Sequence, residues 1–365
     1  MSLPQSEVLV TGPLGCLGSR LVASLVRGLP GHERLSQPRA DLRIRCLAAP
    51  GQEFIPLTKL SDRIRITVGD IRRPADCERF CDGAQGAVLF HTAGAIPPRR
   101  ASESYKINRD GTENLLRAAL AAKVRKVIYV SSSAVFGAPK SNPVTEETPP
   151  APGEAYGRAK LEGERLCHDF TQRGLDVTII RPCTIVGHER SGVFQILFEW
   201  VREGRNIPVL GRGDNAYQFV HADDLAEACI LAAARPGATT YNCGADRFGT
   251  LRETLEHLCA HAKTGSRVKS VPMTPAVWLM KITGALGLSP LGAYHALMCG
   301  RSLYFDIGKA RTELGWQPRS SNNEMFVRSY EWYLKNRETI LRAPGASRHR
   351  SAVEQGILAL VKRLL

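Results

Sequence analysis

The chain opens with a strand, a glycine-rich turn and a helix in immediate succession. The apolar run Val8-Leu9-Val10 leads into a glycine-rich segment, and apolar residues then recur with helical spacing as far as Leu29. In a parallel α/β sheet this order builds a cradle for a dinucleotide pyrophosphate at the helix N-terminus. An ordinary strand-to-helix turn is the alternative, and Pro13 removes one N–H near the expected phosphate. The segment supplies the candidate cofactor-binding residues Thr11, Gly12, Gly15, Cys16, Leu17 and Gly18.

Further apolar runs follow at spacings that suit crossover helices. Strands are expected over 42–47, 64–68, 87–90 and 126–130, with a helix from about Tyr105 to Ala122 between the last two. The chain has 365 residues and 43% hydrophobic content, enough to bury a sizeable core. The pattern predicts an α/β fold, a doubly wound Rossmann-type parallel sheet with a smaller, mostly C-terminal substrate lobe.

Residues at the predicted strand ends are candidates for contacts with the dinucleotide. After strand 64–68 stand Asp70 and Ile71, where Asp70 is placed to accept a hydrogen bond from an adenine amino group or is simply an exposed turn residue. Thr92, Ala93 and Gly94 follow strand 87–90 and are small enough for backbone to lie against a cofactor. After strand 42–47, residues 48–51 carry neither the acid typical of NAD sites nor an Arg typical of NADP sites, so both forms remain open.

Tyr156 and Lys160 are four residues apart, and on a helix they project from one face. A free phenol has a pKa near 10, so acid-base work at pH 7 requires roughly 3 units of phenolate stabilisation, part of which a neighbouring ammonium supplies. A surface pair is the simpler interpretation of such spacing. The run Ser131 to Ser133, directly after strand 126–130, provides a hydroxyl partner at the carboxyl end of the sheet, although serines are also common turn formers.

Taken together, these motifs resemble the extended short-chain dehydrogenase/reductases, the group that contains the NAD-dependent epimerase/dehydratase proteins. The resemblance covers most of residues 6 to 340, since it continues beyond Lys160 through several ordered motifs: Arg181-Pro182, Phe219 to Asp224, Tyr241 to Gly244 and Leu314 to Pro318. It implies that Tyr156 is the catalytic acid/base, that Lys160 binds the nicotinamide ribose and acidifies Tyr156, and that Ser132 orients the substrate oxygen. It also implies a helper role for Asn108, either in helix geometry or in holding a proton-relay water.

The chain departs from several members of that group. Ser133 and Ala134 stand where the resemblance places the Asp-Glu pair of dehydratases, which disfavours dehydration. Thr184 and Tyr217 stand where nucleotide-sugar epimerases carry an Asn and an Arg, which weakens the case for a sugar diphosphate. Four other arginines are candidates for binding a diphosphate in place of the missing one: Arg181, Arg190, Arg205 and Arg212.

The order of motifs predicts three regions. Residues 1–182 form the NAD(P)-binding Rossmann domain, with 217–243 returning to it, and residues 183–216 and 244–340 form the substrate lobe. Residues 341–365 are a basic linker and an amphipathic tail helix. Over 351–365 this helix is expected either to contact an anionic membrane or, more commonly, to dock on its own protein or a dimer partner.

The apolar stretch 275–304 has two interpretations. It forms packed helices of the lobe or lines a hydrophobic substrate pocket, as in relatives that resemble hydroxysteroid and dihydroflavonol oxidoreductases. The resemblance also implies a homodimer formed through two sheet-flanking helices.

Composition helps to exclude other classes of protein and ligand. The net charge of +14 favours anionic ligands, but no basic cluster with interleaved aromatics predicts nucleic-acid binding. No apolar run is long enough to span a membrane, no secretory signal precedes the first strand, and the scattered cysteines indicate reduced thiols of a cytoplasmic protein. No metal site is expected, because the ligand-like trio His257, Cys259 and His261 lacks a fourth partner.

Three functional hypotheses follow. The first is an NAD(P)-dependent oxidoreductase that transfers hydride at a carbinol or carbonyl carbon of a hydrophobic or cyclic small-molecule substrate. The second is an NAD-dependent sugar or nucleotide-sugar epimerase that retains its cofactor. The third, from another class, is a protein that binds NAD(P) without turnover.

Overall fold

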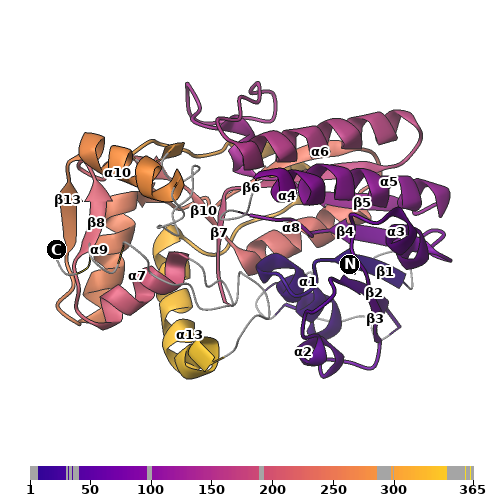
Figure 1. The fold of residues 1–365 in the computed structure, drawn as a ribbon, viewed down its shortest axis with the longest axis horizontal. Coiled ribbons are helices and arrows are strands. Elements are labelled where there is room, and N and C mark those ends of the chain that lie inside the picture. Colours follow the sequence, from indigo (N-terminus) through magenta and orange to yellow (C-terminus); the bar gives the residue numbers. More distant parts are fainter. Residues whose placement is uncertain are drawn as a thin grey trace.

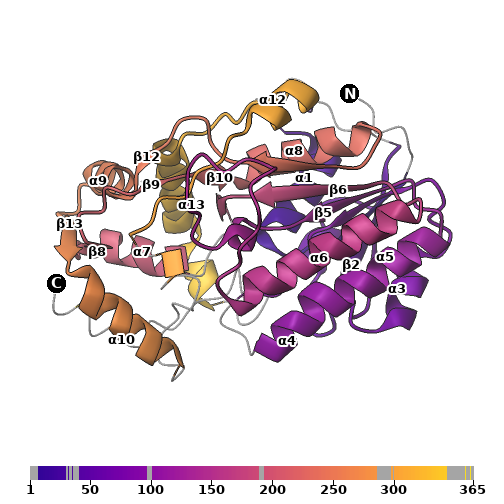
Figure 2. The same cartoon turned by 90° about the horizontal axis from the view of Figure 1, so that it is seen from above.

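A seven-stranded parallel sheet forms the larger part of the molecule (Figures 1 and 2). The computed structural model describes residues 7–29, 32, 35, 41–96, 101–188, 193–285, 297–298, 300–342, 358 and 362. The strand order is β11-β6-β5-β4-β1-β2-β3, so the order reverses between β1 and β4. The strands are β1 (Glu7–Thr11), β2 (Arg43–Ala48), β3 (Ile64–Val68), β4 (Val88–His91), β5 (Lys126–Val130), β6 (Val177–Pro182) and β11 (Thr239–Cys243). The predicted doubly wound Rossmann-type fold is confirmed.

Helices cover both faces of this sheet, which explains why its inner strands are buried along their whole length. One apolar core joins the sheet to α1 (Cys16–Arg27), α2 (Ile55–Thr58) and α8 (Ala222–Ala234). The other core joins it to α3 (Pro74–Cys81), α5 (Gly111–Ala121) and α6 (Ala155–Gln172). Arg20 Nε on α1 lies 2.6 Å from Asp223 Oδ1 on α8 and fixes these two helices to each other.

The helix expected from about Tyr105 to Ala122 is longer and interrupted. It consists of α4 (Ala101–Tyr105), a π-helical turn η2 (Lys106–Asp110) and α5. A π turn inserts one extra residue per turn, and such turns often occur at functional sites. Candidate residue Asn108 lies within this turn.

A smaller lobe lies at the opposite end of the molecule from β1 and β2 (Figure 1). It contains three two-stranded sheets with their own apolar core. Its strands are β7 (Thr184–Val186), β8 (Ile207–Leu210), β9 (Ala216–Tyr217), β10 (Phe219–His221), β12 (Gly249–Thr250) and β13 (Val268–Val271). Its helices are α7 (Val193–Arg202), α9 (Leu251–Ala262), α10 (Met273–Ala285) and α13 (Asn322–Arg342), while α12 (Gly308–Leu314) contacts β11 and α8.

The return of the chain to the central sheet differs in one detail from the expectation. The strand at Phe219–His221 pairs with β7 in a separate two-stranded sheet, whereas β11 joins the edge of the central sheet beside β6. The division into 1–182 with 217–243, 183–216 with 244–340, and 341–365 stays a prediction.

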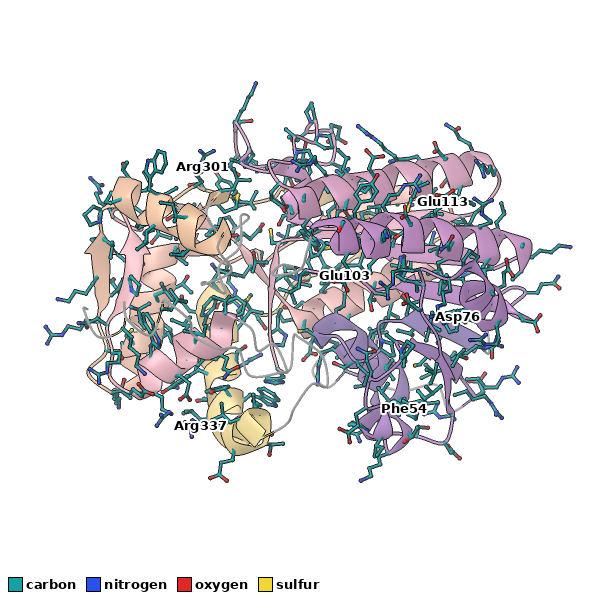
Figure 3. All side chains as sticks on the ribbon, viewed as in Figure 1. Phe54, Asp76, Glu103, Glu113, Arg301 and Arg337 are labelled. Carbon is teal, nitrogen blue, oxygen red and sulfur yellow. The ribbon has the colours of Figure 1, made fainter. Side chains whose placement is uncertain are left out.

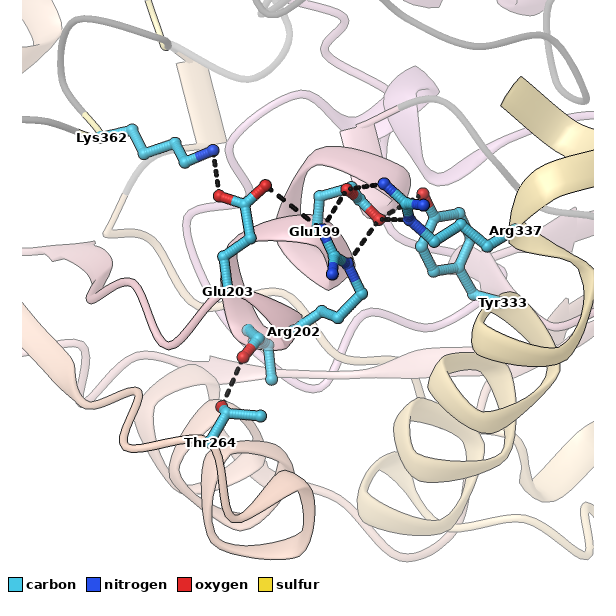
Figure 4. Close-up of polar contacts among 8 residues, drawn as sticks. Glu199, Arg202, Glu203, Thr264, Tyr333, Arg337 and Lys362 are labelled. Carbon is cyan, nitrogen blue, oxygen red and sulfur yellow. Dashed lines mark hydrogen bonds and ion pairs between the residues drawn. The ribbon is translucent and has the colours of Figure 1, made fainter. Parts of the chain in front are cut away.

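Contacts between α7, α13 and the tail appear in Figure 4. Glu199 on α7 accepts hydrogen bonds from Tyr333 Oη at 2.9 Å and from Arg337 Nε at 2.6 Å. One turn later, Glu203 forms an ion pair with Lys362, and Leu358 packs against the apolar core of the lobe. These two tail residues therefore dock on the protein itself. Among the described residues, no helix is long and apolar enough to cross a membrane.

Candidate active site

The glycine turn after β1 has the geometry expected of a pyrophosphate cradle. Gly12 adopts φ of +66°, and a Cβ on Gly18 would lie 2.1 Å from the carbonyl oxygen of Gly12. Gly15 is the N-cap of α1, and no side chain caps this helix. The first N–H groups of α1 lie at the positive end of the helix dipole, where an anion binds well. The residues present fit a dinucleotide.

A chain of hydrogen bonds runs beneath this turn from Thr11 to Asn108. The amide of Ala93 donates to Thr11 Oγ1 at 3.2 Å, and Thr11 Oγ1 lies 2.8 Å from His91 Nδ1. On the other side of the ring, His91 Nε2 lies 3.0 Å from Thr112 Oγ1, and the Thr112 hydroxyl donates to the carbonyl of Asn108 at 2.7 Å. Because Thr112 has one hydroxyl proton, it accepts from Nε2–H, so Nδ1 accepts from Thr11.

His91 is thus held neutral and in one tautomer. Its ring is 1% exposed, and burial, with a smaller contribution from the charge of Lys160, lowers its pKa to about 3. His91 and Thr112 are not among the site residues predicted from the sequence. The signal was present, since a His at the end of a buried strand needs partners for both ring nitrogens.

Asn108 fixes the loop that follows β4. Its Oδ1 accepts from the amide of Ala95 at 2.9 Å, and its Nδ2 donates to the carbonyl of Ala95 at 2.7 Å and to Ser104 Oγ at 3.1 Å. A Cβ on Gly94 would lie 3.0 Å from Asn108 Oδ1 and 3.6 Å from Lys160 Nζ. The Asn108 amide therefore holds Ala95, and with it Gly94, beside Lys160 of α6. The helper role expected of Asn108 stays a prediction.

Lys160 is buried at the carboxyl end of β5. Its Nζ donates to the carbonyl of Val130 at 2.7 Å and lies 4.9 Å from the centroid of the Tyr129 ring. Burial lowers the pKa of Lys160 to about 8, so the ammonium form prevails at pH 7. A positive charge in such surroundings is costly, and an adjacent phenolate would compensate for it.

Ser132 and Tyr156 lie on two segments that are packed together. A Cβ on Gly157 would lie 2.3 Å from the carbonyl oxygen of Ala134, so the short helix η3 (Ser133–Phe136) contacts the first turn of α6. Glu154 caps α6 by accepting from the amides of Tyr156 at 2.7 Å and Gly157 at 2.6 Å, which fixes the start of the helix that carries Tyr156 and Lys160.

The three serines after β5 differ in exposure. Ser131 is 3% exposed and donates to Glu164 Oε1 at 2.5 Å, and Ser133 is 2% exposed. Ser132 is half-buried, and its Oγ accepts from the amide of Ala134 at 3.2 Å. Ser132 is therefore the serine whose hydroxyl best reaches a ligand.

Asp70 and Ile71 follow β3, two strands away from β1. Arg72 binds both carboxylate oxygens of Asp70, with Nε at 3.0 Å and 2.9 Å and Nη2 at 2.5 Å. Hydrogen bonding to Arg72, stronger than the opposing effect of burial, lowers the pKa of Asp70. With Arg72 in this position the lone pairs of the carboxylate are largely engaged, so an adenine contact would require Arg72 to move. Ile71 packs against Gly111, where an added Cβ would lie 2.6 Å from its Cγ1.

Thr184 and Tyr217, the two residues that differ from the epimerase pattern on the expected substrate side, contact each other. Thr184 Oγ1 lies 3.1 Å from Tyr217 Oη, and the Tyr217 ring lies 5.0 Å from that of Phe219. Arg181 makes a buried two-bond ion pair with Glu164, and Arg212 pairs with Asp214. Arg205 is exposed, and Arg190 lies outside the described residues.

Within the described ranges, no three His, Cys, Asp or Glu side chains are arranged to hold a metal ion. The trio of His257, Cys259 and His261 lies on α9, where His261 Nε2 is 3.1 Å from Glu331 Oε1. The nine described cysteines are free thiols and all are buried.

Comparisons with known proteins agree with this geometry. The family model described as "NAD dependent epimerase/dehydratase family" matches residues 8–244. A protein of Sinorhizobium fredii described as "Uncharacterized protein y4nG" is 44% identical, covering 98% of this chain and 90% of its own length.

Two further comparisons involve sugar-nucleotide enzymes. A UDP-glucose 4-epimerase of Mycolicibacterium smegmatis is 28% identical, covering 90% of this chain and 98% of its own. The crystal structure of a UDP-glucose 4-epimerase from Thermotoga maritima with UDP-glucose superposes with a TM-score of 0.72 at 22% identity, covering 90% of this chain and 99% of that chain, which is similarity of fold.

Proposed function

The chain belongs to the NAD dependent epimerase/dehydratase family, and from that premise we propose that it is an NAD-dependent epimerase acting at a secondary alcohol carbon of a nucleotide-linked sugar. The relatives support this hypothesis better than a hydrophobic or cyclic alcohol substrate, which the sequence motifs had favoured. Dehydration is disfavoured because Ser133 and Ala134 offer no carboxylate for removing a carbon-bound proton.

The observation that carries the proposal is the continuous set of contacts from the glycine turn to α6. Gly12 abuts Ala93, and Gly94 abuts Lys160. Lys160 is bonded to Val130, the last residue of the strand that precedes Ser131 and Ser132. Bound at this turn, a dinucleotide supplies reversible hydride transfer at a carbon next to the hydroxyl. Residues from β1, β4, β5 and α6 are thereby grouped at the carboxyl ends of the strands, where ligands of such sheets bind.

We assign the proton steps to three side chains. Tyr156 takes the proton of the substrate hydroxyl as hydride leaves the carbon, and returns it when hydride is delivered to the opposite face. Lys160 favours the phenolate of Tyr156 by its charge, and Ser132 donates a hydrogen bond to the substrate oxygen. Asn108 and His91 hold the loop and turn around them and move no proton.

NAD is the dinucleotide form that we propose. The loop after β2 is closed by a hydrogen bond from the amide of Ala49 to Gln52 Oε1 at 3.0 Å, and residues 48–52 contain no Arg or Lys. A 2′-phosphate would find no cation in that loop.

On the substrate side we propose that Thr184 and Tyr217 contact the ligand through neutral hydroxyls, where a guanidinium is expected from the resemblance. Tyr217→Phe should then raise KM more than it lowers kcat, because a binding contact is lost. Homodimerisation, and membrane contact through residues 351–365, also stay predictions.

The test is a panel of nucleotide sugars, comprising UDP-glucose, UDP-galactose, UDP-glucuronic acid and dTDP-glucose, with products resolved by NMR. The proposal expects a C4 epimer, no net change in nicotinamide absorbance, and NAD in the mass spectrum of the denatured protein. Net reduction of added NAD(P) by a hydrophobic alcohol would instead support the oxidoreductase hypothesis. Bound NAD(P) with no turnover of either substrate class would support a binding protein.

A further inference from the structure

Helix α10 is predominantly apolar, with Lys281 as the one charged residue in its sequence, yet one of its faces lies in solvent. Ala276, Val277 and Met280 are half-buried and Thr283 is buried, so this side rests on the lobe. Helices that are apolar all round are normally enclosed by protein or lipid. The outward face of α10 therefore lacks its expected surroundings.

The outward face is a continuous stripe. Pro275, Trp278, Leu279 and Ile282 follow helical spacing of three, four and seven residues, which places them on one side. Trp278 is 65% exposed, Leu279 48% and Ile282 53%, and Met273 at the start of the helix is 46% exposed. Isolated exposed apolar residues are common, but a large aromatic and two aliphatic side chains in one stripe mark an interaction surface.

The chain segment that contains this stripe carries charges of one sign only. Between Glu256 and Asp306 the chain contains no acidic residue, and its charged residues there are Lys263, Arg267, Lys269, Lys281 and Arg301. Arg267, Lys269 and Arg301 are exposed, and none of the three side chains forms an ion pair or hydrogen bond with a described residue. Such a segment is unusual in a chain with 35 acidic residues.

These basic residues flank α10 in space as well as in sequence. Strand β13 carries Lys269 and leads directly into α10 at the edge of the lobe (Figures 1 and 2). Gly300 abuts the start of α10, since an added Cβ would lie 2.8 Å from Met273 Sδ, and Arg301 follows it beside the helix (Figure 3). An apolar stripe with a Trp and flanking cations matches the interface of an anionic lipid bilayer.

We propose that the outward face of α10 docks this protein on an anionic membrane surface. Trp278, Leu279 and Ile282 enter the boundary between headgroups and acyl chains, while Lys269 and Arg301 contact lipid phosphates. The helix lies in the interface and does not span it, because its 13 residues fall short of the roughly 20 that a crossing requires.

A second copy of the chain fits this face less well. In a two-fold dimer the same surface meets itself, so Lys269 and Arg301 would meet a copy of a segment that contains no acidic residue of its own. An acidic protein partner would satisfy the charge, but it requires no outward Trp. The lipid surface accounts for both the charge and the stripe.

Co-sedimentation of the full chain with vesicles tests the proposal. We expect binding to vesicles of equimolar phosphatidylcholine and phosphatidylglycerol, and little binding to phosphatidylcholine alone. Trp278→Ser combined with Ile282→Ser should lower the partition coefficient by on the order of tenfold or more, because two interfacial side chains are lost. Lys269→Gln combined with Arg301→Gln should weaken binding to the anionic vesicles alone. Ile55→Ser on α2, where the side chain is 51% exposed, is the matched control and should bind as the parent does.

Three results would overturn the proposal. Absence of the full chain from the anionic vesicle pellet would exclude a lipid partner and favour an acidic protein. Undiminished pelleting of the Trp278→Ser, Ile282→Ser protein would assign binding to another surface, such as the tail. Dissociation of a parent oligomer in that variant, seen by analytical ultracentrifugation, would identify the face as a contact between copies. Thermal melting of each variant confirms that it is folded.

Discussion

The ammonium nitrogen of Lys160 lies 2.7 Å from the carbonyl oxygen of Val130, the last residue of β5. This bond fastens α6 to the strand that continues into Ser131 and Ser132. It also holds a cation in a buried position, where the charge costs stability. In the proposed mechanism this charge favours the phenolate of Tyr156. Functional sites commonly contain residues that lower the stability of the fold.

The pH dependence of that cost is the first prediction. Between pH 8 and 10.5 the unfolded chain keeps the Lys160 proton while the folded chain has lost it, so the wild type gains stability as pH rises. Lys160→Met lacks this gain. Relative to the variant, the wild type should therefore gain about 2 to 3 kcal/mol between pH 7 and 10.5, as measured by urea unfolding. A constant difference across that range would show that Lys160 is not desolvated.

The second prediction concerns the stability of the folded chain at low pH, where the buried His91 matters. Its pKa is about 3 in the folded chain against about 6.5 when unfolded, so the unfolded state alone takes up the proton as pH falls below 6.5. The wild type should lose about 2 to 3 kcal/mol relative to His91→Gln between pH 7 and 4.5. Chemical denaturation at both pH values measures this, and parallel behaviour of the two proteins would contradict it.

Gly15 and Gly18 should respond differently to an added methyl group. Gly15 has φ of −73° and its new Cβ would lie 3.3 Å from Gly12 O, so Gly15→Ala should fold normally and lose NAD affinity, because the methyl occupies the phosphate approach. Gly18→Ala would place its Cβ 2.1 Å from the same oxygen and should lower the melting temperature. Differential scanning fluorimetry with and without NAD separates the loss of NAD affinity from the loss of stability. Equal NAD affinity of Gly15→Ala and wild type would show that this turn does not hold the pyrophosphate.

Ser131 and Ser132 are adjacent, and their substitution by alanine should have opposite effects on stability and activity. Ser132→Ala should lower kcat by roughly 10²-fold or more without changing the melting temperature, because a donor to the reacting oxygen is lost. Ser131→Ala should instead cost about 1.5 to 3 kcal/mol of stability, since a buried hydroxyl bonded to Glu164 is removed. Loss of activity in Ser131→Ala and loss of stability in Ser132→Ala would instead indicate that Ser131 contacts the substrate.

Several parts of the fold and site could be read from the residues. The strand Lys126–Val130 is buried on both faces and has the predicted bounds, and the glycine spacing located the turn after β1. Such features are local, since each depends on residues that are close together in sequence.

Other features depend on contacts between distant residues. The hydrogen bonds of His91 join residues 11 and 112. The neighbouring hydroxyls of Thr184 and Tyr217 belong to β7 and β9, with α7 and β8 between them in the chain. Within the apolar stretch 275–304, Trp278 on α10 is exposed, which the sequence could not show, because periodicity reports which face is apolar and not what covers it. Residues 286–296 of this stretch lie outside the described ranges, so the choice between packed helices and a substrate pocket stays a prediction. The π turn at Asn108 has no periodicity signal long enough to detect.

The most direct test of the central claim is single-turnover chemistry in Tyr156→Phe. The phenyl ring preserves packing while removing the proton-carrying oxygen, so the account predicts NAD binding and melting temperature equal to wild type and epimerisation slowed by about 10² to 10⁴-fold. Epimerisation of the accepted nucleotide sugar at the wild-type rate would show that Tyr156 does not move the proton.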